Sequence, residues 1–121
     1  MPAFRSMTIH YNDADNVVKY TLPANLGFSM CITVIKNHES AGQAVVFVTG
    51  YHGGIVADAV RKGYYLKGIS YITNSNSIDI YVKVNSFVFV TAKCMGASDK
   101  RFIKSASIVS EIPEGAKEVT F

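Results

Sequence analysis

Alternation of apolar and polar residues with a period of two is the feature that most constrains the fold of this chain. It is clearest over residues 78–84. Ile78, Ile80, Val82 and Val84 share one face of an extended segment there, and Asp79, Tyr81 and Lys83 share the other. One dry and one wet face is typical of an antiparallel sheet with one solvated side. We therefore expect β-structure at this point rather than helix.

Similar segments recur along the chain, separated by short runs rich in Asn, Asp, Ser and Gly that predict turns. The remaining predicted strands are residues 4–11, 17–22, 28–36, 43–49, 64–73, 87–95, 102–110 and 118–121. Eight or nine short strands with regular turns predict a sandwich or barrel. We expect one domain over residues 1–121, an all-β, antiparallel two-sheet sandwich that is jelly-roll-like.

At most one short helix is expected. Over residues 55–62, Val56, Ala59 and Val60 recur at spacings that could line one face of a helix. Eight residues are too few for a helix to stand alone in water, so this one would need packing against the sheets.

Two of the predicted strands are apolar on both faces. In residues 43–49, Val45 and Phe47 oppose Ala44, Val46 and Val48, and residues 87–95 show the same pattern. A two-layer sandwich buries only one face of each strand, so the second face needs other cover. Cover by a loop or the short helix is one reading, and an interface between subunits is the other.

Composition excludes several classes of function. Apolar residues make up 49% of the chain and charged residues 17%, which argues against disorder. The net charge of +3 comes from scattered residues, with Lys100, Arg101 and Lys104 the nearest approach to a cluster, so no nucleic-acid partner is expected. The first residues lack the apolar stretch of a signal peptide, and no run is long enough to span a bilayer, so we expect synthesis in a cytoplasm and no membrane insertion.

The residues that usually carry catalysis or bind metals show no recognisable pattern. His10, His38 and His52 lack close ligand spacing, and the acidic residues fall mainly in predicted loops and near the C-terminus. Cys31 and Cys94 lie in apolar strands and are expected as buried free thiols, with a bridge between neighbouring strands left open. We expect no enzyme, no cofactor and no metal site.

Aromatic residues offer the best candidates for binding, with seven Tyr, seven Phe and no Trp. The glycine-rich residues 50–54 predict an irregular turn that would present Tyr51 and His52, with Tyr64 and Tyr65 nearby. Tyrosine has an apolar ring and a polar tip, which suits a surface that binds sugar or protein. The candidate ligand-binding residues are Tyr51, His52, Tyr64, Asn74 and Asn76.

The chain resembles the C-terminal receptor-binding and trimerisation domains of bacteriophage tail fibres and tailspikes. The segments that carry the likeness are residues 17–22, 64–69, 78–84 and 87–90. Within 78–84, an "IYVK" strand precedes a hairpin into an apolar strand, as in many fibre tips. The likeness covers most of the chain without a diagnostic motif. A fibre tip normally follows a shaft, and this sequence shows none after Met1, so it could be an excised domain or a small protein of another role.

The resemblance implies a homotrimer that binds a bacterial surface polysaccharide or protein and belongs to a virion tail assembled in the host cytoplasm. Such tips have no fixed set of binding residues, so none is carried over. Two alternatives stay open: a purely structural trimerisation cap, and a carbohydrate-binding accessory module of a polysaccharide-degrading enzyme.

Overall fold

The computed structural model describes residues 4–9, 16–23, 27–36, 42–51, 54–85, 88–96 and 103–121. Within these ranges every regular element is a β-strand, and the strands form two five-stranded sheets. The first sheet has the order β1 (Phe4–Ile9), β8 (Val88–Gly96), β3 (Phe28–Lys36), β4 (Ala44–Tyr51) and β5 (Gly54–Arg61). The second has the order β10 (Lys117–Val119), β6 (Leu66–Thr73), β7 (Ser77–Val84), β2 (Asn16–Pro23) and β9 (Ser105–Val109).

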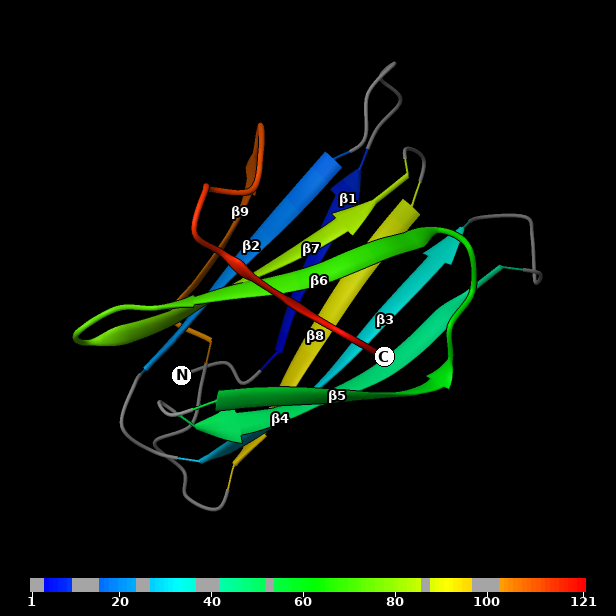
Figure 1. The fold of residues 1–121 in the computed structure, drawn as a ribbon. Coiled ribbons are helices and arrows are strands. Elements are labelled where there is room, and N and C mark those ends of the chain that lie inside the picture. The colour runs from blue at the N-terminus through cyan, green and yellow to red at the C-terminus, as the bar shows by residue number, and fades with distance from the viewer. Residues whose placement is uncertain are drawn as a thin grey trace.

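All strand pairs in both sheets are antiparallel. Figure 1 shows the sheets as two layers, with β6 and β7 in one and β4 and β5 in the other. The expected all-β sandwich is confirmed. Early strands pair with late ones, β1 with β8 and β2 with β7, which gives the wrapped, jelly-roll-like course.

The helix expected over residues 55–62 is wrong, because this segment is strand β5. Ile55 and Ala57 are buried while Val56 and Asp58 are exposed, so the burial alternates with a period of two. Backbone pairing with β4 satisfies the strand along its length, whereas a helix of this length would gain little by itself.

The hydrophobic core lies between the two sheets and is formed by the inner face of each. The predicted dry face of β7 is confirmed, since Ile78, Ile80, Val82 and Val84 are all fully buried. On β2, Tyr20 points into the core, and its hydroxyl donates a long hydrogen bond of 3.5 Å to the carbonyl of Val90 on β8. This contact joins the two sheets across the core.

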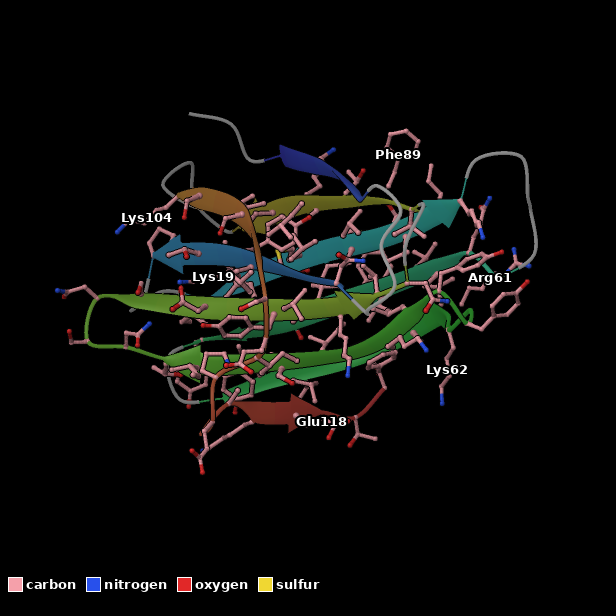
Figure 2. All side chains as sticks on the ribbon, turned by 90° about the horizontal axis from the view of Figure 1, so that it is seen from above. Lys19, Arg61, Lys62, Phe89, Lys104 and Glu118 are labelled. Atoms are coloured by element: carbon pink, nitrogen blue, oxygen red, sulfur yellow. The ribbon has the colours of Figure 1, made fainter. Side chains whose placement is uncertain are left out.

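The outer face of the second sheet is partly covered by the chain itself. Strands β9 and β10 lie at opposite edges of this sheet, so residues 110–116 must cross it. Figure 2 shows the crossing segment running over β2, β7 and β6 to reach β10. Tyr81 is 4% exposed for this reason, so the predicted wet face of β7 is only partly wet.

Candidate functional site

Four of the five predicted binding residues are exposed, but they do not form one site. Tyr51 ends β4 and is 61% exposed, and Tyr64 follows β5 and is 59% exposed. The glycine-rich residues 50–54 lie where β4 ends and β5 begins. The rest of the segment between the two tyrosines is mostly the strand β5, eight residues long, and not the helix expected there. At about 3.3 Å per residue such a strand spans roughly 26 Å. Tyr51 and Tyr64 therefore lie at opposite ends of the sandwich, and the predicted Tyr51–Tyr64 cluster is wrong (Figure 1). His52 lies outside the described residues.

Asn74 and Asn76 lie in the hairpin between β6 and β7, at the end opposite Tyr64 (Figure 1). The Asn74 side-chain amide donates to Ser77 Oγ at 3.2 Å and to Asp79 Oδ2 at 2.9 Å, and its backbone N–H donates to the Ser77 carbonyl. Asp79 also accepts a hydrogen bond from Thr21 Oγ1 at 2.7 Å. The amide of Asn74 is thus engaged within the hairpin, whereas Asn76 is exposed.

The Tyr64 end is held by close packing. The backbone N–H groups of Tyr64 and Tyr65 both donate to the Gly42 carbonyl, at 3.1 and 3.4 Å. A Cβ atom at Gly42, whose φ is +79°, would lie 2.5 Å from Tyr64 Cζ, so the exposed ring is seated directly on this glycine. Tyr65 is 4% exposed, and its ring centroid lies 4.6 Å from that of Tyr64. The Tyr64 ring is therefore presented to solvent in a fixed position.

Basic side chains gather at this same end. Lys36 Nζ lies 5.1 Å from the centroid of the Tyr65 ring, a cation–π distance. Arg61 and Lys62 follow directly along the edge strand β5 and are exposed (Figure 2). They are distant from Lys36 in sequence, and only the antiparallel β3–β4–β5 pairing brings them to one end. A fixed ring beside cations can contact the face of a sugar and an anionic substituent on it.

A hollow of about 350 Å³ lies on the second sheet where residues 110–112 cross it. Val17, Lys83, Ser110, Glu111 and Ile112 line it. Glu111 is the single carboxylate among these five residues, so the lining lacks the acid pair that glycoside hydrolysis uses.

The largest unusual surface is the outer face of the first sheet. The side chains of β8, β3, β4 and β5 that point away from the core include large apolar residues, interspersed with Ser29, Thr33, Thr49 and Thr91. Its exposed large apolar members are Ile35 (41%), Phe47 (36%), Val56 (61%) and Phe89 (39%). We call this surface, with Cys31, Val45, Lys93 and Asp58, the outer apolar face. Each of the four large apolar side chains keeps more than a third of its surface exposed.

Lys93, Cys31, Phe47 and Asp58 form one lateral row across the outer apolar face. The register pairs Lys93 with Cys31, Cys31 with Phe47, and Phe47 with Asp58 on four successive strands. Burial raises the pKa of the Cys31 thiol, and the charge of Lys93 lowers it in part. Both cysteines are free. They point to opposite faces of the sheet, since Cys94 pairs with the core residue Met30. Cys94 is buried as expected, whereas Cys31 is only half-buried.

Comparisons with protein-family models, curated proteins and solved structures give no match. Within the described part of the chain, no three His, Cys, Asp or Glu side chains are placed to hold a metal ion. The same part contains no helix with the length and apolar character needed to cross a bilayer. Sequence reasoning found the two apolar strands behind the outer apolar face but missed Cys31, Lys93 and Asp58, whose alignment depends on the register between strands.

Proposed function

We propose that this chain is a non-enzymatic binding and assembly domain of the fibre-tip kind. It self-associates through the outer apolar face of its first sheet and presents its loop ends to a bacterial surface glycan. Its place would be on a phage tail fibre or tailspike, where the resemblance implies three copies. The single observation that carries the proposal is the exposure of the outer apolar face.

The two outer faces of the sandwich differ in a way that supports this proposal. The second sheet turns Lys19, Thr21, Asp79 and Lys83 outward, and the segment 110–116 crosses it. The first sheet instead turns Ile35, Phe47 and Phe89 outward with more than a third of each side chain exposed. Large apolar side chains exposed on one face of a sheet make that face a candidate site of interaction.

Glycan binding would fall to the Tyr64 end rather than to the five residues predicted together. Tyr64 is exposed and fixed on Gly42, and Arg61 and Lys62 stand beside it. A single shallow contact of this type is weak, but several copies held in one assembly multiply it through effective concentration.

The self-association is tested by the molar mass in solution, measured by light scattering over a range of concentrations. One copy has a mass of 13.2 kDa, and we expect a multiple of this value. Phe47→Glu places a carboxylate at the centre of the outer apolar face and should return the mass to one copy without loss of fold. Ile108→Glu is the matched control, because Ile108 is 49% exposed on β9 of the other sheet. A wild-type mass of one copy at every concentration would refute the proposal.

The glycan function is tested on an array of bacterial polysaccharides. Tyr64→Ala should abolish binding and leave the molar mass unchanged, since Tyr64 lies between β5 and β6 and outside the row at the centre of the outer apolar face. A self-associating protein that binds no glycan on the array would instead fit the purely structural cap.

A further inference from the structure

The charges on the outer apolar face are placed asymmetrically. In the lateral row, Lys93 stands on β8 at one side, Asp58 stands on β5 at the other, and Cys31 and Phe47 lie between them. Both charged residues are exposed. Among the described residues neither Lys93 nor Asp58 has an ion-pair partner. At about 4.8 Å per strand, the two charged positions are roughly 14 Å apart.

From this arrangement we infer that the partner on the outer apolar face is a second copy of this chain, packed face to face about a two-fold axis parallel to the strands. This inference rests on the self-association proposed above and adds its geometry, with two copies in place of the three that the resemblance implies. Such an axis passes between Cys31 and Phe47. It places Lys93 of each copy opposite Asp58 of the other, so that two reciprocal ion pairs form from one row.

The same axis matches the sizes of the central side chains. It sets the small Cys31 of one copy opposite the large Phe47 of the other, twice. The neighbouring row sets Thr33 of one copy opposite Val45 of the other, two side chains of similar size. An isologous interface requires this kind of self-complementarity, in which a patch fits its own rotated image.

The alternative two-fold axis also lies in the plane between the two facing sheets, but it runs across the strands. It would place Lys93 against Lys93 and Asp58 against Asp58, and like charges in apposition disfavour an interface. The charges therefore select one of the two face-to-face arrangements.

The size of the surface reaches the lower limit for a specific pair. The two-fold axis lies between β3 and β4, so β8, β3, β4 and β5 of one copy lie over β5, β4, β3 and β8 of the other. Four strands of about eight residues present a face of roughly 500 Å². Two such faces would together remove about 1,000 Å² from water, the least that a specific interface is expected to bury. Sheets that pack face to face with their strands nearly aligned lie about 10 Å apart.

The experiment uses two variants, each with one charge of the lateral row reversed. Asp58→Lys gives a copy whose row carries two positive charges, and Lys93→Asp gives a copy with two negative charges. Each variant alone should associate at least about tenfold more weakly than the wild type, because both ion pairs become repulsive. An equimolar mixture of the two variants should recover association, because both pairs then have opposite charges. Affinities and masses are read by sedimentation velocity.

Lys117→Asp and Glu118→Lys are the matched controls, since both residues are exposed on β10 of the other sheet. They should leave the association unchanged. If a reversed variant unfolds at a lower temperature, Asp58→Asn and Lys93→Gln replace it, with weaker association expected from each.

Four results would overturn the inference. Unchanged association of both single variants would show that Lys93 and Asp58 form no ion pairs between copies. Failure of the mixture to recover association would contradict the two-fold arrangement. A wild-type mass of three copies would also overturn it while leaving the proposed self-association intact. A wild type that stays at one copy would refute both proposals.

Discussion

Cys31 and Cys94 lie on neighbouring strands, but they differ in their surroundings. Cys94 points into the core and is 3% exposed, whereas Cys31 lies on the outer apolar face beside Lys93. Their side chains leave the sheet on opposite sides, so they cannot form a disulfide within one chain.

We expect a thiol reagent at high protein dilution to modify Cys31 rapidly and Cys94 only on unfolding. The Cys31 thiol has a raised pKa because of burial, so its reaction rate should keep rising at a pH where an ordinary thiol has levelled off. Lys93→Ala removes the charge that lowers this pKa and should slow the reaction at pH 8. Mass spectrometry after timed quenching measures both rates.

Cys31→Ser is the control for site assignment and should leave a folded protein that takes up almost no reagent. Equal reactivity of the two thiols in the folded state would contradict the faces assigned to them. Because the proposed pairing covers Cys31, raising the protein concentration should also protect it.

The hairpin between β6 and β7 shows how far one element could be anticipated. The run of Asn and Ser residues predicts a turn there, and the turn is confirmed. The structural role of the Asn74 side chain, in contrast, could not be predicted. Its amide meets Asp79, which in turn accepts from Thr21 on β2, and that contact depends on the pairing of β7 with β2. A residue that looks free in sequence is thus used for structure.

We expect Asn74→Ala to lower the free energy of unfolding by about 1–2 kcal/mol, because it removes two side-chain hydrogen bonds, one to a carboxylate. Asn76→Ala, on the exposed tip of the same hairpin, should change it by less than about 0.5 kcal/mol. Chemical denaturation of both variants gives the comparison. Equal effects would mean that the Asn74 contacts contribute nothing.

Strand β5 shows where sequence reasoning failed on an element. Val56, Ala59 and Val60 have helical spacing, but the same stretch also alternates, with Ile55 and Ala57 turned to the core. Over eight residues a helical period cannot be told from the period of two of a strand. Pairing with β4, which lies earlier in the chain, makes this segment a strand. The misplaced Tyr51–Tyr64 site followed from this one error, because a strand keeps its two ends apart.

At the scale of the whole molecule, two layers with one core between them could be predicted from alternation alone. The sheet order, the segment that crosses the second sheet and the alignment of Lys93 with Asp58 could not. These features depend on which strands become neighbours, and residues far apart in sequence decide that.

Tyr20 links the stability of the two layers to pH. Burial raises its pKa, so the folded protein keeps the phenol proton at a pH where the unfolded chain, with a pKa near 10.0, has lost it. The contribution of Tyr20 to stability is complete below pH 10 and falls as the pH rises above that value. The loss is about 1.4 kcal/mol per pH unit for one such group.

Tyr20→Phe should therefore flatten the alkaline side of the stability curve, measured by urea unfolding from pH 8 to 12. At pH 8 the variant should be within about 1 kcal/mol of the wild type, since it loses only a long hydrogen bond to Val90. Tyr81 also has a raised pKa, from burial and from the Asp79 carboxylate, so some alkaline slope should remain. Parallel curves for variant and wild type would show that Tyr20 ionises freely in the folded state.

The pairing of early strands with late ones has a consequence for synthesis. Strand β1 cannot find its partner until the ribosome has released residues 88–96, and β2 must wait for residues 77–84. The pairs β3–β4 and β4–β5 join strands adjacent in sequence and can form while translation continues, whereas the second partner of β3, strand β8, arrives late. The nascent chain therefore carries an unpartnered leading strand through most of its emergence, and closure of the sandwich is a late step that depends on the C-terminal third.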